Sequence, residues 1–517
     1  MINISSTSNI KQSEINMFNT GISSIELMGK AGKSCAHYFN FYGKVAIVCG
    51  KGNNAGDGYA LALELIESKT INKNDLKIYL ICESFSDSGK FYYDKCKNED
   101  FNIEVLDKNY DLSDYDIIVD AILGVGAKSD LSEEYINAIN CINNAKIKNN
   151  QLKVVSIDIN SGMNSDIGIG KNVVLSDMTL SIGYYKPGHF LNMAKDVMKD
   201  KKNIDIGIKL IDDCYKLYEV DDIKKMFKKR LQFSHKGSYG KIAIIGGSIE
   251  YSGAIRLAAV SLISLRSGVG MSTIAAPKYL VPVISNNILE SMIYALTSDE
   301  NEIIFDKNNI DNLMSKVDAI TIGMGLGRSK GAEDTVKYII SNFNGTLILD
   351  ADALYILSKN IDLLSSKKSK IIITPHIKEY ERLLISDINK IFKSDVLNDI
   401  NIPDEVLYSA DACKSFAKKY DITILLKGPT TIITDGKDVA LVDRGTAGMA
   451  TAGSGDVLSG IISGMIFQIE NTFDAVVAAC FVNGMAGEAA AAEYGEISML
   501  SSDTAKNVAK VIKLLSE

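Results

Sequence analysis

The stretch that decides the fold of the first half of the chain is Val45-Ala46-Ile47-Val48-Cys49-Gly50-Lys51-Gly52-Asn53-Asn54-Ala55-Gly56-Asp57-Gly58. Its apolar residues predict a buried strand, and the glycines behind them predict a tight turn into a helix. Glycines at such a turn let backbone amides approach a phosphate, and the helix N-terminus favours the anion. A turn of this kind also serves packing alone, so the motif by itself leaves both interpretations open. The oxygens of Asn54 and Asp57 favour a ligand, because they suit a cation or sugar hydroxyls.

The alternation of strand and helix continues through the first half. Strand-like runs are Lys44–Cys49, Leu76–Cys82, Ile103–Leu106, Asp116–Asp120, Lys153–Ile157 and Asp177–Ile182. Helix-like spacing of apolar residues marks residues 8–40, Gly56–Ser68 and Ser132–Asn143. Strands that alternate with helices predict a mostly parallel sheet with helices on both faces.

Residues 195–230 interrupt this pattern with two charged segments, Lys195–Lys202 and Val220–Arg230. We place a domain boundary near residue 214, with one domain over residues 1–214 and another over residues 226–517. The alternative is an exposed helix inside a single domain. The length of 517 residues favours the boundary, because the chain is too long for one ordinary core.

The alternation resumes in the second half. Strand-like runs are Lys241–Ile245, Met271–Ala275, Asp318–Ile322, Thr346–Leu349, Lys370–Thr374 and Ile422–Leu426. Thr430–Thr434 and Val439–Val442 predict a hairpin around Asp435-Gly436. Three helical segments close the chain, Gly455–Gln468, Phe473–Ala492 and Ser502–Leu515. The sequence therefore predicts the α/β fold class, in two domains.

The composition excludes several classes of protein. Apolar residues make up 46% of the chain and charged residues 23%, which rules out disordered, collagen-like and coiled-coil proteins. The net charge of −8 argues against a nucleic-acid binder. The chain has only six arginines, so we expect backbone amides and lysines to hold any phosphate.

Cysteine usage and hydropathy indicate the compartment. The eight cysteines form no CxxC pair and are typical of reduced thiols, and the four histidines show no metal-ligand spacing. The first residues lack the basic and apolar regions of a secretory signal. No window of about 20 residues is apolar throughout. We therefore expect a cytoplasmic protein with neither a membrane nor a nucleic acid as partner.

Two further turns of the first half carry acidic residues. One strand ends in Asp120-Ala121-Ile122-Leu123-Gly124-Val125-Gly126, and another ends in Asp158-Ile159-Asn160-Ser161-Gly162-Met163-Asn164. Ligands of open parallel sheets bind beyond the carboxyl ends of the strands. A single aspartate at a strand end is usually a helix cap. Three turns with flanking glycines favour a site formed by Asn54, Asp120, Asp158 and Ser161.

The sharpest motif of the second half is Thr451-Ala452-Gly453-Ser454-Gly455-Asp456-Val457-Leu458-Ser459-Gly460. Small residues that lead into a helix form an anion site lined by amides. Asp456, in the first turn, can take a proton from a hydroxyl that is about to attack phosphorus. The alternative is an aspartate that only caps the helix.

Four loops that follow strands support a site in this half. They are Lys427–Thr431, Thr374–Glu379, Gly323–Arg328 and Gly246–Ala254. The first can hold a nucleotide phosphate or ribose. His376, alone, would be an ordinary polar residue, but its place at a strand end among these loops favours a ligand contact.

The motifs GKGNNAGDGY, DAILGVG and DINSGMNSDIG resemble the NAD(P)H-hydrate epimerase family, whose members usually read GNNGGDG and DxPSG. Ala55 replaces a glycine and adds a methyl near the expected phosphate path. Asn160 replaces a proline, which we expect to loosen the turn. The resemblance implies a Rossmann-like three-layer sandwich and a potassium ion on Asn54, Asp120 and Ser161.

The same resemblance implies which residues bind the hydrated nucleotide in the first half. They are Asn53, Asn54, Ala55, Gly56, Asp57, Gly124, Val125, Gly126 and Asp158. Asp158 is the candidate for proton transfer. Lys186 is a weaker candidate, for which the alternative is a surface lysine in a turn.

Residues 226–517 resemble the ADP/ATP-dependent NAD(P)H-hydrate dehydratase family, a branch of the ribokinase-like three-layer sandwiches. The resemblance rests on GGS–YSGA, GMGLG, DADAL, TPH–E, KGPTT and AGSGD in this order, with Ala452 in place of a usual glycine. It implies that Ala254, Gly327, His376 and Asp456 bind the hydrated nucleotide, with Asp456 as catalytic base. It also implies that an adenine nucleotide, ADP or ATP with Mg²⁺, binds at Lys427, Gly428, Pro429, Thr430, Thr431 and Gly455.

Together the halves imply repair of NADH and NADPH that have been damaged by hydration of the nicotinamide ring. The first half would interconvert the R and S hydrates, and the second would dehydrate the S form. One alternative is a ribokinase-like kinase for a small molecule such as a vitamin precursor, fused to a nucleotide-binding module. Another is a first half that only senses nucleotides, against which the presence of Asp120 and Asp158 counts. The expected partners are small-molecule substrates and further copies of the chain in a homo-oligomer.

Overall fold

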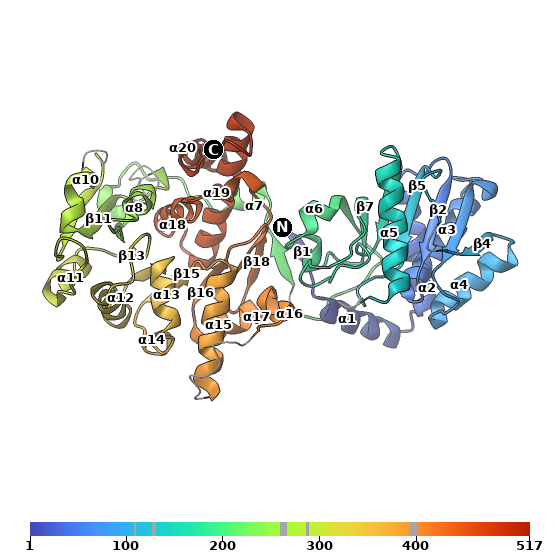
Figure 1. Cartoon of the computed structure of the whole chain (residues 1–517), viewed down its shortest axis with the longest axis horizontal. Coiled ribbons are helices and arrows are strands. Elements are labelled where there is room, and N and C mark those ends of the chain that lie inside the picture. The colour runs from blue at the N-terminus through green and yellow to red at the C-terminus, as the bar shows by residue number, and fades with distance from the viewer. Residues whose placement is uncertain (108–109, 127–130, 213, 259–265, 286–288, 393–400) are drawn as a thin grey trace. The chain divides into compact units, whose positions relative to one another are not determined.

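The computed structural model describes residues 1–517 except 108–109, 127–130, 213, 259–265, 286–288 and 393–400 (Figure 1). The chain divides into two compact units. One comprises Asn3–Tyr215, and the other comprises Lys216–Glu517 together with Met1–Ile2.

The first unit is built on a sheet of seven parallel strands in the order β4-β3-β2-β5-β6-β7-β8. The strands are β2 (Val45–Cys49), β3 (Leu76–Leu80), β4 (Asn102–Val105), β5 (Ile117–Ala121), β6 (Lys153–Ile157), β7 (Ser176–Ile182) and β8 (Met198–Ile204). The helices are α1 (Thr7–Asn19), α2 (Ser24–Tyr38), α3 (Asn53–Glu67), α4 (Asp87–Asn98), α5 (Glu133–Lys148) and α6 (Ala194–Val197). The predicted parallel α/β organisation is confirmed.

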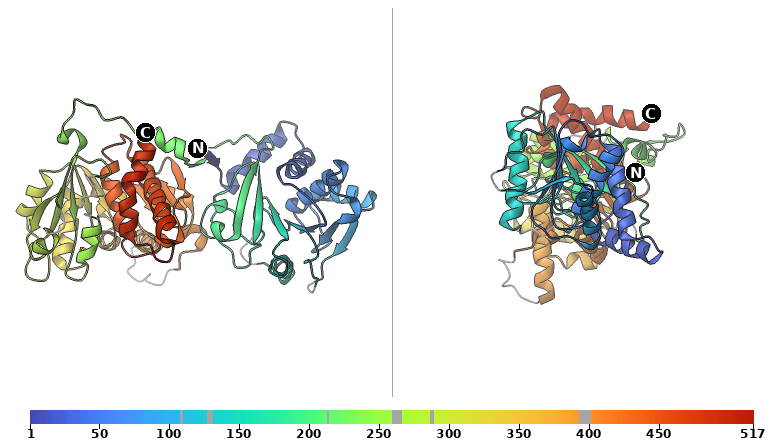
Figure 2. Two further views of the ribbon diagram at one scale, coloured as in Figure 1. Left: turned by 90° about the horizontal axis from the view of Figure 1, so that it is seen from above. Right: turned by 90° about the vertical axis from the view of Figure 1, so that its right-hand side faces the viewer.

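Helices cover both faces of this sheet (Figures 1 and 2). Successive residues of a strand point to opposite faces. Val45 and Ile47 of β2 therefore pack in the cluster beneath α2, α3 and α4, whereas Ala46 and Val48 pack in the cluster beneath α5. Burial on both faces explains why the sequence of β2 is apolar without alternation.

From the sequence we expected the charged segment Lys195–Lys202 to interrupt the alternation of strands and helices, but it contributes a strand to this unit. Met198–Ile204 forms β8, which pairs in parallel with β7 at the edge of the sheet. Lys199, Asp200 and Lys202 are exposed there. Charged side chains on an edge strand prevent pairing with other chains, and they also make the strand look like a linker in the sequence.

The strands of the second unit belong to a mixed sheet of eleven strands in the order β1-β9-β18-β17-β16-β15-β14-β13-β10-β11-β12, in which β1 and β9 contain the residues where the chain passes from one unit to the other. The strands are β1 (Ile2–Ile4), β9 (Tyr215–Leu217), β10 (Lys241–Ile245), β11 (Met271–Pro277), β12 (Met292–Leu296), β13 (Ala319–Ile322), β14 (Thr346–Leu349), β15 (Lys370–Ile373), β16 (Thr423–Leu426), β17 (Thr431–Thr434) and β18 (Val439–Val442). Neighbours from β12 to β16 are parallel. The predicted hairpin of β17 and β18 is confirmed, with Gly436 at a φ of +86° in its turn.

The helices of this unit also form two layers. They are α7 (Val220–Lys224), α8 (Ser252–Ala258), α10 (Val281–Ser285), α11 (Lys307–Met314), α12 (Lys330–Asn342), α13 (Asp352–Ser358), α14 (Leu363–Ser366), α15 (Ile377–Phe392), α16 (Asp404–Leu407), α17 (Ala410–Tyr420), α18 (Ser454–Met465), α19 (Thr472–Tyr494) and α20 (Ser501–Ser516). Helices α18 and α19 lie on one side of the strands, and α12, α13 and α15 lie on the other (Figure 1).

Helix α19 is the one helix of the described residues that is long and apolar enough to cross a membrane. Most of it, however, is buried in the cluster that α18, α19 and α20 form over the sheet. Its apolar sequence is therefore explained by the core of this unit.

We predict that a fragment of residues 226–517 is less stable than a fragment of residues 216–517. The longer fragment keeps β9, whose Leu217 pairs with Leu441. It also keeps α7, whose Ile223 is fully buried in the cluster that α18, α19 and α20 form over the sheet. Burial of Ile223 alone is worth roughly 1.5–3 kcal/mol. Thermal unfolding of both fragments, followed by circular dichroism, measures the difference. Equal melting temperatures would show that β9 and α7 add nothing to this core.

Candidate functional site

In the first sheet, the order in which successive strands are added changes direction at β2. The chain adds β3 and β4 on one side of β2 and then crosses to β5, β6 and β7 on the other. Ligands bind at such a reversal, because the loops diverge there and leave a crevice. The first turns of α3 contain Asn53, Asn54, Ala55, Gly56 and Asp57, and the loop after β5 contains Gly124, Val125 and Gly126. The loop after β6 contains Asp158 and Ser161, so all the residues expected for the first half lie at this edge.

Asp120, in β5, is fully buried among hydrogen-bond donors. Its Oδ1 accepts from the Ser161 hydroxyl at 2.5 Å and from the Ile122 amide at 3.3 Å. Its Oδ2 accepts from the Ser161 amide at 2.9 Å and from the Ser156 hydroxyl at 2.8 Å. Burial raises the pKa of Asp120, and these hydrogen bonds oppose the rise. The structure thus joins two of the three expected potassium ligands directly.

The third expected ligand, Asn54, is 7% exposed, and neither polar atom of its side chain has a hydrogen-bond partner. Gly124 lies close to both Asn54 and Asp158. A Cβ on Gly124 would lie 2.9 Å from Asp158 Oδ2 and 3.3 Å from the Asn54 Cβ. An unpaired buried amide is costly unless a ligand satisfies it. The side-chain oxygen of Asn54, the carboxylate of Asp120 and the hydroxyl of Ser161 are together the kinds of donor that suit a hard cation.

Among the residues that the structure describes, no three His, Cys, Asp or Glu side chains come together as a metal site. The donors at this edge are instead an amide oxygen, a hydroxyl and one carboxylate. This donor set agrees with a monovalent hard cation better than with a transition metal.

The expected loosening of the turn at Asn160 is wrong. Its side chain is fully buried, and its Nδ2 donates to the carbonyl oxygens of Val174 at 2.7 Å and Val197 at 3.0 Å. Its Oδ1 accepts from the Thr179 hydroxyl at 2.6 Å. These bonds fix the turn where a proline would have stiffened the backbone. Ala55 is also buried, and its methyl packs in the core cluster beneath α3.

Asp158 follows β6 and adopts a φ of +68°. Its Oδ1 accepts from Nζ of Lys186, which is 1% exposed and therefore no surface lysine. Its Oδ2 accepts from the Val125 amide at 3.1 Å. The buried His189 connects the two backbones, because its Nε2 donates to the Asp158 carbonyl at 2.8 Å and its Nδ1 accepts from the Lys186 amide at 3.0 Å. Burial lowers the pKa of His189 to about 3, so the ring is neutral.

The surroundings shift the pKa values of two carboxyl groups of this site, Asp158 and Asp57, in opposite directions. Burial disfavours ionised Asp158, but the ammonium of Lys186 outweighs burial and holds the pKa below its usual range. Burial raises the pKa of Asp57 well above its usual range, and the charges of Asp158 and Glu14 raise it further. Glu14, on α1, was not indicated by any motif. The surroundings of the site therefore favour the ionised form of Asp158 and the neutral form of Asp57.

The second sheet reverses in the same way at β10. Strands β11 and β12 lie on one side of β10, and β13, β14 and β15 lie on the other. Asp350 follows β14 directly and is buried. Its Oδ1 accepts from Lys427 Nζ at 2.8 Å, and its Oδ2 accepts from the Ser459 hydroxyl at 2.7 Å. Burial opposes the ionisation of Asp350, but Lys427 holds its pKa below the usual range.

Asp456 lies in the first turn of α18, as predicted. Burial and the charge of Asp350 raise the pKa of Asp456 to about 7, although Lys427 lowers it. A carboxyl group that titrates near neutral pH is suited to general-base catalysis.

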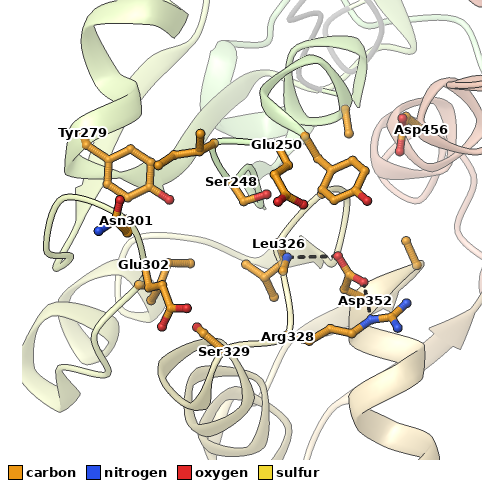
Figure 3. A pocket seen from close by; sticks show the side chains of 17 residues that line it. Ser248, Glu250, Tyr279, Asn301, Glu302, Leu326, Arg328, Ser329, Asp352 and Asp456 are labelled. Atoms are coloured by element: carbon orange, nitrogen blue, oxygen red, sulfur yellow. Dashed lines mark hydrogen bonds and ion pairs between the residues drawn. The ribbon is translucent and has the colours of Figure 1, made fainter.

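A pocket of about 850 Å³ opens beside Asp456 (Figure 3). Ala254, Gly327 and Asp456 line it, which are three of the four residues expected to bind the hydrated nucleotide in this half. The rest of the lining comes from the loops that follow β10, β11, β12, β13 and β14. Asp352 holds one of these loops, because it accepts from the Gly327 amide and from Arg328 Nε, both at 3.0 Å.

The fourth of these residues, His376, does not line the pocket. It follows β15 and forms a β-bridge with Lys427, which follows β16. Burial and the charge of Lys427 lower the pKa of His376. The start of α18 approaches the same lysine, since a Cβ on Gly455 would lie 3.2 Å from Lys427 Nζ. His376, Lys427 and Gly455 thus lie together, next to Asp456.

The other expected adenine-nucleotide residues continue from Lys427. Gly428 and Pro429 are exposed, while Thr430 is buried and donates through its hydroxyl to Asp443 at 2.8 Å. Thr431 begins β17. The exposed part of this loop is therefore the part accessible to a nucleotide.

No role for Asp350 or Asp352 was predicted from the sequence. The signal was present, because both belong to the DADAL motif directly after the strand Thr346–Leu349. The pairing of Asp350 with Lys427 spans 77 residues, and no local pattern indicates it.

Comparison with known proteins shows which families the two halves of the chain match. A family model described as NAD(P)H-hydrate dehydratase matches residues 242–510, and one described as YjeF-related protein N-terminus matches residues 24–188. The bifunctional NAD(P)H-hydrate repair enzyme Nnr of Dictyoglomus turgidum is 30% identical over 476 residues, which cover 90% of this chain and 88% of that protein. The protein of the same name from Coxiella burnetii is 29% identical over 500 residues, 94% of each chain.

Solved structures resemble part of the chain. An ADP/ATP-dependent NAD(P)H-hydrate dehydratase from Bacillus subtilis, co-crystallized with ATP and Mg²⁺, is 23% identical, with 58% of this chain and 99% of that chain covered and a TM-score of 0.46. The two family matches and the relatives that align along nearly the whole length establish the family. This chain belongs to the bifunctional NAD(P)H-hydrate repair enzymes, with the epimerase-related part first and the dehydratase part second.

Proposed function

We propose that the chain repairs NADH and NADPH whose nicotinamide ring has gained water. Residues 1–214 interconvert the R and S hydrates, and residues 226–517 dehydrate the S hydrate at the expense of ADP or ATP. The observation that carries the proposal is Asp456, which lines the pocket, feels the charge of Lys427 and has a pKa raised to about 7. Cytoplasmic location and a homo-oligomeric state stay predictions from the sequence.

In the dehydratase, Asp456 takes the proton of the ring hydroxyl, whose oxygen then attacks the terminal phosphorus of the nucleotide. The bond from this phosphorus to its bridging oxygen breaks, and AMP or ADP leaves. The new phosphate ester is a better leaving group than hydroxide. It departs as phosphate while the neighbouring ring carbon loses a proton, which restores the double bond of the dihydronicotinamide.

The residues around Asp456 supply charge and position. Lys427 and the amides at the start of α18, near Gly455, stabilise the charge of the transferred phosphoryl group. We assign His376, Ala254 and Gly327 to the hydrated nucleotide, and the loop Lys427–Thr431 to ADP or ATP. Mg²⁺ bound with the phosphates would neutralise further charge during the transfer.

In the epimerase, the hydroxyl group is on a carbon next to the ring nitrogen, so the nitrogen lone pair assists its departure. We assign Asp57 as the acid that protonates the departing hydroxyl, which leaves as water. Asp158 is the base that takes a proton when water returns to the opposite face. The opposite shifts of their pKa values support this division, because each group then holds the form that its step requires.

We assign potassium to the oxygens of Asn54, Asp120 and Ser161. Bound potassium would supply a fixed positive charge at this strand edge. The unpartnered amide of Asn54 supports the assignment, since nothing in the described protein satisfies it.

A kinase for a vitamin precursor would share the Gly-Ser-Gly-Asp turn of residues 453–456 but would release a phosphorylated product. The deciding experiment incubates the chain with hydrated NADH and ADP or ATP. Recovery of the dihydronicotinamide absorbance together with free phosphate supports repair. A stable phosphorylated product without that absorbance supports the kinase. Dehydration of the S hydrate alone, with no interconversion of R and S, would support a first half that only senses nucleotides.

We predict that Asp456→Asn lowers dehydration by about 10²–10⁴-fold, because it removes the base. The variant keeps its fold and nucleotide binding, since asparagine has the same shape. In the wild type, kcat/KM rises as pH increases through about 7, where Asp456 ionises. Turnover is measured between pH 5 and pH 9. Wild-type turnover by the variant would exclude Asp456 as the base.

We predict that Asn54→Leu abolishes the response of the chain to potassium. Potassium raises the melting temperature of the wild type relative to sodium. At a tenfold excess of potassium over its Kd, binding raises the free energy of unfolding by about 1.4 kcal/mol. The variant loses epimerisation but not stability, because leucine removes an amide that has no partner in the protein. S-hydrate dehydration is the internal control. A wild type that melts identically in both salts would contradict the potassium site.

We predict that His189→Phe lowers kcat for epimerisation more than it changes KM, because the ring no longer fixes the backbones of Asp158 and Lys186. His189→Gln restores part of the rate, since its amide can donate to the Asp158 carbonyl. Phe190→Leu, a buried neighbour outside this network, is the control for a general loss of stability. If Phe190→Leu and His189→Phe reduce kcat equally, the effect is one of stability alone.

A further inference from the structure

We infer that the end of the second unit's pocket farthest from Asp456 is a subsite for an adenosine whose ribose carries a free 2′-hydroxyl. The chain therefore dehydrates hydrated NADH in preference to hydrated NADPH. This inference rests on the proposed dehydratase function and adds a selectivity to it.

The sheet gives the pocket its length. Asp456 adjoins Asp350 at the end of β14, Tyr279 follows β11, and Asn301 and Glu302 follow β12. The strand order β14-β13-β10-β11-β12 separates these ends by four strand spacings, about 19 Å in all. Figure 3 shows Tyr279, Asn301 and Glu302 together on the side of the pocket opposite Asp456. A pocket of this length suits a dinucleotide rather than a single ring.

The position of Asp456 sets the direction of the substrate. Since Asp456 must face the hydroxyl of the nicotinamide ring, the adenosine at the other end of the dinucleotide lies towards Tyr279 and Glu302. The ring of Tyr279 is half-buried and offers a face for stacking on adenine. Glu302 lies close enough for its charge to raise the pKa of Tyr279, together with burial and Asp299.

The charges along the pocket disfavour a second phosphate on the adenosine ribose. The described residues that line it include Glu250, Glu302, Asp352 and Asp456, and none of these described residues is a lysine. Arg328, the arginine among these described lining residues, is already paired with Asp352. A carboxylate accepts hydrogen bonds from ribose hydroxyls, whereas a 2′-phosphate requires a cation. The pyrophosphate is common to both substrates and does not distinguish them.

The test compares the S hydrates of NADH and NADPH as substrates of the full chain, with ADP or ATP at saturation. We expect the wild type to prefer hydrated NADH in kcat/KM by about tenfold or more. Glu302→Gln reduces this ratio by lowering KM for hydrated NADPH, and Glu302→Lys reduces it further or reverses it. Glu300→Gln, an exposed neighbour on the same loop that does not line the pocket, leaves the wild-type ratio.

Two results would overturn the inference. One is a wild-type ratio near one, and the other is a ratio that Glu302→Gln and Glu302→Lys leave unchanged. Both require that the wild type turns over hydrated NADH, so neither affects the proposed function. Failure to form dihydronicotinamide from either hydrate would instead overturn the proposed function itself.

Discussion

A buried aspartate paired with a buried or half-buried lysine organises each of the two sites. Asp158 pairs with Lys186 in the first unit, and Asp350 pairs with Lys427 in the second. Each aspartate follows a central strand of its sheet, so its backbone is fixed by the ladder behind it. Loss of one partner from a buried pair is costly, about 3–5 kcal/mol, because the other charge stays buried and uncompensated. The loops of both sites therefore depend on these pairs for their position.

Close packing around the two pairs explains the glycines nearby. A Cβ on Gly124 would lie 2.9 Å from Asp158 Oδ2, and a Cβ on Gly455 would lie 3.2 Å from Lys427 Nζ. The first distance leaves no room for a side chain, and the second would force the lysine to move. The glycines of these motifs are thus needed beside the charged groups, and not only in the turn where the backbone approaches a phosphate.

The sequence was sufficient for most of the strands, the hairpin and the motifs at the strand ends. Apolar runs followed by glycine are local signals, so β2 and the loop that contains Asn54 could be placed without a structure. The partners of the aspartates could not, because Lys186 and Lys427 reach them across 28 and 77 residues. Glu14 was missed for the same reason, since it reaches the site from a helix that precedes the sheet. Strand β8 was missed because its exposed lysines serve an edge strand and a linker equally well.

Each site contains two buried or half-buried carboxyl groups whose pKa values are shifted in opposite directions. The aspartate that has the lysine stays ionised, while its neighbour without one, Asp57 or Asp456, has a raised pKa. The ionised aspartate itself contributes to that rise through its charge. A single structural device thus provides a permanent charge and, next to it, a group able to exchange a proton. In the first unit the second group is suited to donate a proton, whereas Asp456, with a pKa of about 7, is suited to accept one at neutral pH. At both sites the neighbouring lysine lowers the pKa of the second carboxyl group, against the burial and the charge of the ionised aspartate that raise it.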